Sequence, residues 1–162
     1  MEAGDPLYRI PASVPHRRDG WGDGPGTVVD DEIQVPIRSD QDIVTARQKG
    51  RGLAAALNFS SAGATLITLA ISELARNIVA YAKKGEIRLR VVNRGAARQG
   101  IQVVAHDKGP GIADVEQALR DGFSTSGGLG LGLPGVRRLM DEFEIQSKEN
   151  QGTTVTVMKW KT

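Results

Sequence analysis

Residues 64–83 read ATLITLAISELARNIVAYAK, and this stretch determines how the rest of the chain is arranged. Its apolar residues recur every three or four positions, which is typical of a helix with one face in a core. The predicted buried stripe contains Ile67, Ala70, Ile71, Leu74, Ile78 and Ala82. The predicted outer, solvated side contains Thr65, Thr68, Ser72 and Arg76.

Glu73 and Asn77 lie four residues apart in this helix, so they share a face at the margin of the apolar stripe. A carboxylate and an amide beside a core cost free energy unless something satisfies them. Two interpretations remain at this point. The pair either ends the apolar stripe at the surface or belongs to a binding site.

The flanking segments predict an α+β two-layer sandwich. Its sheet is mostly antiparallel and covered by helices on one face. Strands are expected wherever apolar and polar residues alternate, and Pro36 predicts that the first strand lies at a sheet edge. The predicted strands are 33–37, 86–91, 101–105, 142–148 and 153–160, and the predicted helices are 40–57, 64–83, 114–119 and 136–140.

Composition excludes several classes of function. The 162-residue chain contains no cysteine and only two histidines, so thiol catalysis and Cys- or His-rich metal sites are excluded. Its 21 basic and 19 acidic side chains nearly balance, so a nucleic-acid partner is not expected. No run approaches the roughly 18 uncharged apolar residues of a membrane helix, so a membrane location is not expected either.

Residues 1–30 differ from the remainder. They hold four of the seven prolines and five glycines, with scattered apolar residues that form no face. We expect a disordered N-terminal tail over 1–30, or an arm that binds a partner, followed by one folded domain over 31–162.

A second polar motif, Asp107-Lys108-Gly109-Pro110-Gly111, follows directly on a predicted apolar strand. An aspartate at a strand end offers a fixed acceptor, and glycines let a planar ligand approach the backbone. The same residues also suit an ordinary turn, so this motif alone leaves both interpretations open.

The third motif is Gly127-Gly128-Leu129-Gly130-Leu131-Gly132-Leu133-Pro134, which leads into a helix. Its glycines would let the backbone fold closely around a ligand, and the start of the helix offers free N–H groups to a phosphate. A flexible linker is less consistent with the regularly spaced leucines.

These three motifs, in this order, resemble the ATP site of the GHKL superfamily of ATPases and kinases over residues 32–160. The resemblance is closest to the anti-sigma-factor-type serine/threonine kinases, specifically the RsbT-type switch kinases of the bacterial stressosome. The strings that carry it are Thr45–Arg51, Glu73–Val79, Phe123–Gly130 and Leu133–Phe143.

The resemblance implies a Bergerat-type α/β sandwich that binds ATP and Mg²⁺. It implies that Glu73 is the general base, that Asn77 is the Mg²⁺ ligand and that Asp107 reads adenine, with Gly109 and Gly111 beside the base. It further implies a phosphate-side lid and a threonine that helps to hold adenine. The residues implied for those two parts are Ser126, Gly128, Leu129, Gly130, Leu131, Gly132 and Thr154.

The implied function is a cytoplasmic serine/threonine protein kinase that phosphorylates STAS-domain scaffold proteins. After its release from the scaffold it would bind and activate a PP2C-type phosphatase or an equivalent output protein. One alternative is an ATP-bound anti-sigma or sequestering protein that acts mainly by binding. Another is a histidine-kinase-like ATPase module, although neither His16 nor His106 suits a phosphoacceptor on a dimerising helix.

Overall fold

A computed structural model describes residues 7–9, 26–28, 32–120 and 132–162. The described strands form one sheet in which every pairing is antiparallel. Its strand order is β1-β6-β7-β5-β4-β2, and β3 also pairs with β4. The strands are β1 (Leu7–Arg9), β2 (Gly26–Val28), β3 (Ile33–Ile37), β4 (Gly85–Arg94), β5 (Arg98–Asp107), β6 (Glu142–Lys148) and β7 (Gly152–Trp160).

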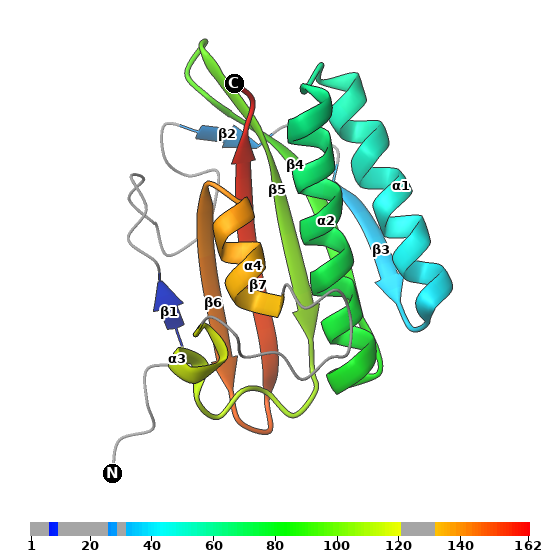
Figure 1. Ribbon diagram of the computed structural model, residues 1–162, viewed down its shortest axis with the longest axis vertical. Coiled ribbons are helices and arrows are strands. Elements are labelled where there is room, and N and C mark those ends of the chain that lie inside the picture. The colour runs from blue at the N-terminus through cyan, green and yellow to red at the C-terminus, as the bar shows by residue number, and fades with distance from the viewer. Residues whose placement is uncertain (1–6, 10–25, 29–31, 121–131) are drawn as a thin grey trace.

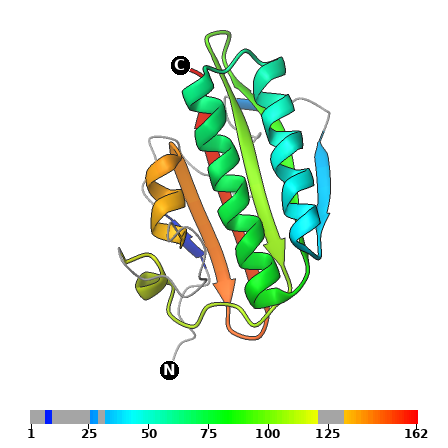
Figure 2. The same ribbon diagram turned by 45° about the vertical axis from the view of Figure 1, so that its right-hand side comes forward.

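The longer helices cover one face of this sheet (Figures 1 and 2). The predicted two-layer α+β sandwich is therefore confirmed. The helical elements are α1 (Asp40–Ala56), α2 (Ser61–Asn77), the π-helical turn η1 (Ile78–Ala82), α3 (Val115–Ala118) and α4 (Gly132–Leu139). The prediction of an edge strand is also confirmed, because β3, with Pro36, pairs with β4 and with no other described strand.

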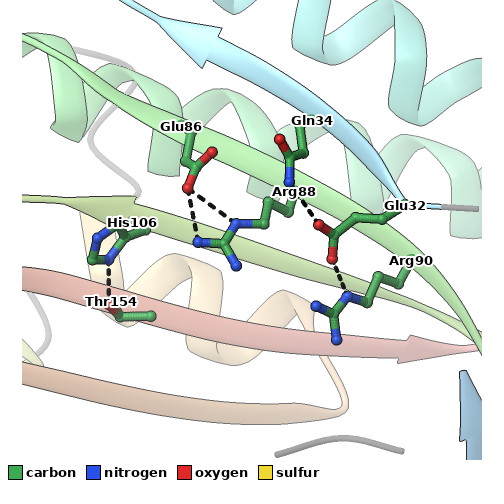
Figure 3. A network of polar contacts seen from close by, with 7 residues as sticks. All are labelled: Glu32, Gln34, Glu86, Arg88, Arg90, His106 and Thr154. Atoms are coloured by element: carbon green, nitrogen blue, oxygen red, sulfur yellow. Dashed lines mark hydrogen bonds and ion pairs between the residues drawn. The ribbon is translucent and has the colours of Figure 1, made fainter.

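The core lies between the sheet and the helices. On β4, Ile87 and Leu89 are fully buried toward the helices, while Glu86, Arg88 and Arg90 alternate with them and are only partly buried. Figure 3 shows these charged residues on the side of the sheet that faces away from the helices. The period of two along a strand separates the two faces, as the sequence predicted.

Helix α2 lies between α1 and α4 in Figure 2 and is buried on more sides than the sequence predicted. Thr68 and Ser72, expected on the solvated side, are only 6% and 8% exposed. Their hydroxyl groups donate to the carbonyl oxygens of Ala64 and Thr68, at 2.8 and 2.9 Å, so burial leaves neither hydroxyl unpaired. Neighbouring helices bury these side chains, and the periodicity of one helix does not show where its neighbours pack.

The continuous helical stretch Ser61–Ala82 has the length and apolar composition of a membrane span. Much of it is buried inside the fold, with Ile67, Ala70 and Ile71 fully buried in the core. Core packing therefore accounts for its apolar composition. Ser60 caps the start of this stretch, because its Oγ accepts a hydrogen bond from the Gly63 N–H at 3.0 Å.

Two strands lie within the segment expected to be an unstructured tail. β1 pairs with β6 and β2 pairs with β4, so these short segments extend the sheet on both sides. Within the predicted tail, the structure thus describes strands at 7–9 and 26–28. Pairing of this kind needs only backbone N–H and C=O groups, so it leaves no apolar periodicity in the sequence.

Candidate functional site: a cavity at the end of the central helix

A cavity of about 260 Å³ opens where η1, the ends of β5 and β7 and the start of α4 meet. Its walls are mostly apolar, with a few polar groups, which is typical of a small-molecule site. The lining residues are Leu74, Asn77, Ile78, Tyr81, Ala105, Asp107, Pro110, Gly111, Ile112, Ala118, Gly132, Leu133, Thr153 and Val155. Residues of all three sequence motifs meet here.

Asp107 is the last residue of β5 and lines the cavity. Its Oδ1 accepts a hydrogen bond from the Gly109 N–H at 2.8 Å. Burial raises the pKa of the Asp107 carboxyl, while hydrogen bonds from the Gly109 and Thr153 N–H groups and the nearby His106 oppose that rise. The carboxyl is thus held in place with capacity for a further donor, as the exocyclic amine of a base would require.

The two glycines after Asp107 lie where a side chain would not fit. A Cβ on Gly109 would come within 2.5 Å of the Ala82 Cβ in η1. Gly111 has a φ of +73°, and a Cβ there would come within 2.1 Å of the Lys148 carbonyl oxygen. These glycines let the loop pack against η1 on one side and against the β6–β7 turn on the other.

Hydrogen bonds to the β6–β7 turn hold the same loop. The Asn150 N–H donates to the Pro110 carbonyl oxygen at 2.6 Å. The Ile112 N–H donates to Ser147 Oγ at 2.8 Å, and that hydroxyl also lies 3.1 Å from the Gly152 carbonyl oxygen. The wall of the cavity is therefore fixed by residues about forty positions further along the chain.

Sequence reasoning missed Ser147, which is 6% exposed. A signal was present, because Phe143, Ile145 and Ser147 alternate along β6 and all three are buried. A serine at the inward position of such a strand indicates that its hydroxyl has a partner inside the fold. The sequence alone did not reveal that the partner is the loop after Asp107.

Asn77 lines the cavity at the last α-helical position of α2, directly before the π-helical turn. Short π-helical segments frequently occur at functional sites. Glu73 lies one turn earlier and is only 1% exposed, and it does not itself line the cavity. Its Oε1 accepts a hydrogen bond from Arg76 Nη1 at 2.7 Å, whereas its buried Oε2 has no hydrogen-bond partner among the described residues.

The structure places the predicted site residue Thr154 away from the cavity. Thr154 Oγ1 lies 2.7 Å from His106 Nδ1 on the face of the sheet away from the cavity (Figure 3). Its neighbour Thr153 lines the cavity instead. Successive strand residues point to opposite faces, so an error of one position moves the hydroxyl to the wrong side of the sheet.

Part of the glycine-rich motif lines the cavity. Gly132, with a φ of +55°, and Leu133 contribute the first residues of α4 to its wall. The predicted lid residues Ser126, Gly128, Leu129, Gly130 and Leu131 lie outside the described residues. The apolar walls and Tyr81, which is 46% exposed, were not among the predicted site residues.

The residues present fit Mg²⁺ with a nucleotide. Mg²⁺ is a hard cation that keeps several waters and takes few protein oxygens beside those of phosphates. Asn77 would supply one amide oxygen from the cavity wall. The unpartnered Oε2 of Glu73, one helical turn away, would accept a hydrogen bond from a water or a hydroxyl group. The roles given to Glu73, Asn77 and Asp107 stay predictions.

Comparison with known proteins gives the family. The model of the histidine kinase-like ATPase domain matches residues 37–159. Over 133 residues the chain is 50% identical to serine/threonine-protein kinase RsbT of Bacillus subtilis, covering 82% of this chain and 98% of the relative. Over 97 residues it is 30% identical to an anti-sigma F factor of Caldanaerobacter subterraneus, covering 58% of this chain and 68% of the relative.

A crystal structure of the RsbU and RsbW domains of a Mycobacterium tuberculosis protein shares the fold, with a TM-score of 0.54 at 20% identity. The match covers 80% of this chain and 32% of that longer chain. The chain belongs to the histidine kinase-like ATPase family, and within it to the RsbT-type serine/threonine-protein kinases.

Proposed function

We propose that this protein transfers the γ-phosphoryl group of ATP to a serine or threonine hydroxyl of a STAS-domain scaffold protein. One observation carries the proposal. Glu73 is buried and has a carboxylate oxygen without a partner among the described residues, one helical turn from Asn77, which lines the cavity of about 260 Å³. The similarity to a relative named as a serine/threonine-protein kinase supports the same chemistry.

In this proposal, different residues along the cavity bind different parts of the nucleotide and its metal ion. Asp107 reads the base at the end of β5, and Thr153 lies beside it. The N–H groups at the start of α4 face the phosphates, where a helix dipole favours negative charge. Asn77 holds Mg²⁺, which neutralises charge on the phosphates when it is bound.

Glu73 then acts as general base. The substrate hydroxyl oxygen forms a bond to the γ-phosphorus while the bond from that phosphorus to the β–γ bridging oxygen breaks, and ADP leaves. The hydroxyl proton passes to the Glu73 carboxylate. A positioned base contributes about 10²–10⁴-fold to the rate.

The test uses γ-labelled ATP, the protein and a purified STAS-domain partner, with variants Glu73→Gln and Glu86→Gln. Glu86 is partly buried on the opposite face of the sheet, where it pairs with Arg88. Glu73→Gln should bind ATP normally in a calorimetric titration but transfer phosphate about 10²–10⁴-fold more slowly. Glu86→Gln should behave as wild type. A normal transfer rate in Glu73→Gln would remove the general base from the proposal.

The downstream step belongs to the same proposal. After release from the scaffold, the protein would bind and activate a PP2C-type phosphatase or an equivalent output protein in the cytoplasm. Arg47 and Arg51 are exposed on α1 and are candidates for contacting an acidic partner surface. Arg51→Glu should weaken capture of the phosphatase while leaving ATP affinity unchanged.

A second function is favoured by the similarity to anti-sigma F factors. The protein would sequester a sigma factor or other partner, with ATP as a structural ligand. The two functions differ in one measurement. A sequestering protein would bind its partner equally well as wild type and as Glu73→Gln, and neither form would transfer label to it.

A further inference from the structure

Arg76 and Glu73 form an ion pair within α2, three residues apart. Arg76 Nη1 donates to Glu73 Oε1 at 2.7 Å. The arginine side chain is 30% exposed, whereas the glutamate side chain is 1% exposed. One partner therefore reaches solvent while the other lies almost wholly inside the fold.

Burial makes this pair different from a surface ion pair. A carboxylate that leaves water loses its hydration, so its ionised form needs a nearby positive charge and a donor. Among the described residues, Arg76 is the one that donates a hydrogen bond to the Glu73 carboxylate. Because Arg76 occupies Oε1, the second oxygen, Oε2, is the one left without a partner.

We infer that Arg76 is a positioning residue for phosphoryl transfer: it holds the Glu73 side chain in one orientation, with Oε2 left to accept the substrate proton. This inference rests on the proposed role of Glu73 as base. Arg76 is not among the described residues that line the cavity, and its hydrogen bond is to Glu73, so we assign its effect to Glu73.

The chain offers a matched pair for comparison. Arg88 Nη2 donates to Glu86 Oε1, also at 2.7 Å, and the Arg88 side chain is likewise 30% exposed (Figure 3). Glu86, however, is also 30% exposed and lies on the face of the sheet away from the cavity. Exposed pairs of this kind contribute little, so Arg88→Met controls for loss of an arginine and of an ion pair.

The first experiment compares Arg76→Met, Arg76→Lys and Arg88→Met with labelled ATP and a STAS-domain partner. Methionine keeps the apolar stem and the helix propensity of arginine but removes its charge and donors. Arg76→Met should lower kcat roughly tenfold to a hundredfold, the equivalent of a hydrogen bond to a charged group, with KM for ATP unchanged. Arg76→Lys should recover much of the rate, and Arg88→Met should match wild type.

The second experiment repeats Arg76→Met in a Glu73→Gln background. If Arg76 acts only through the carboxylate, the double variant should be as slow as Glu73→Gln alone, since coupled residues are not additive. A further tenfold loss in the double variant would overturn the inference, as would a wild-type kcat in Arg76→Met. Loss of ATP affinity in Arg76→Met would also overturn it, because that result indicates a binding role.

Two comparisons distinguish loss of the positioning role from loss of stability and from failure of the proposed base. Removing Arg76 alone leaves a buried carboxylate without its partner, which can destabilise the fold. The double variant has no charge at either position, so it should unfold at a temperature closer to wild type and remain measurable. If Glu73→Gln itself transfers phosphate normally, the proposed base fails. If only Arg76→Met does so, the base stands and the positioning role fails.

Discussion

Gly111 and Lys148 approach so closely that no side chain fits between them: a Cβ on Gly111 would come within 2.1 Å of the Lys148 carbonyl oxygen. The Asn150 N–H donates to the neighbouring Pro110 carbonyl oxygen at 2.6 Å. The β6–β7 turn thus fixes the loop that carries the cavity wall after Asp107. Disrupting this contact should lower nucleotide affinity as well as stability.

Gly111→Ala should therefore displace the loop, lower the melting temperature and weaken ATP binding. Gly95→Ala is the matched control, because Gly95 also has a positive φ, +66°, but has open space where a Cβ would lie. A left-handed conformation costs a residue with a Cβ about 1–2 kcal/mol, and both variants share that cost. Only Gly111→Ala should change ATP affinity by calorimetry, and equal affinities in the two variants would contradict the role given to the contact.

Asp107→Asn should weaken ATP binding roughly tenfold to a hundredfold, because a hydrogen bond to a charged group contributes about 1.5–3 kcal/mol. Wild type should also prefer ATP to GTP, since guanine presents an acceptor where adenine presents its amine. Asp114→Asn is the control, because Asp114 caps α3 and asparagine caps equally well. Equal affinity of wild type for ATP and GTP would remove Asp107 from the base site.

Asn77→Ala should abolish Mg²⁺-dependent ATP turnover. The variant removes the amide that lines the cavity at the end of α2, while alanine preserves the helix. A magnesium titration of ATP turnover measures the effect. Asn93→Ala, at the far end of β4, where Asn93 Oδ1 accepts from Gln99 Nε2, should leave the titration unchanged. An unaltered titration in Asn77→Ala would assign the metal to other groups.

Thr153→Val and Thr154→Val test the two faces of β7 separately. Each variant keeps a β-branched residue in the strand and loses one side-chain contact, with Ser147 for Thr153 and with His106 for Thr154. Their stabilities should therefore fall by similar amounts, about 1 kcal/mol each. Nucleotide affinity should fall in Thr153→Val alone, and a selective loss in Thr154→Val would restore the sequence-based choice.

Glu142 should make stability depend on pH away from the site. Burial raises the pKa of its carboxyl above the ordinary 4.5, although the hydrogen bond from the Trp160 indole opposes that rise. Between 4.5 and the folded-state pKa, the folded protein keeps a proton that the unfolded chain has released. The contribution of Glu142 to stability is therefore present below 4.5 and is lost as pH rises through the folded-state pKa.

Urea unfolding of wild type and Glu142→Gln across this range measures the effect. The stability of wild type relative to the variant should fall as pH rises from 4.5, because glutamine does not titrate. A flat difference would indicate that the Glu142 carboxyl titrates equally in both states.

The sequence alone determined the layers of the fold and the location of three site segments. Alternation on β4 and β6 and the helical spacing around Glu73 and Asn77 are local patterns, so each could be read without knowing its neighbours. The glycines after Asp107 were informative for the same reason, since their need for close backbone approach is a property of the residue itself.

Tertiary structure decided what depends on contacts between distant residues. It selected Thr153 instead of Thr154, because the register of β7 against β5 sets which hydroxyl faces the cavity. It also brought Ser147 to the loop after Asp107 and buried Glu73 so that, among the described residues, Arg76 alone donates to one of its carboxylate oxygens. Helical spacing places a side chain on one face of a helix. Only the packing of other elements against that face determines whether the side chain is hydrated, paired or left with a free oxygen.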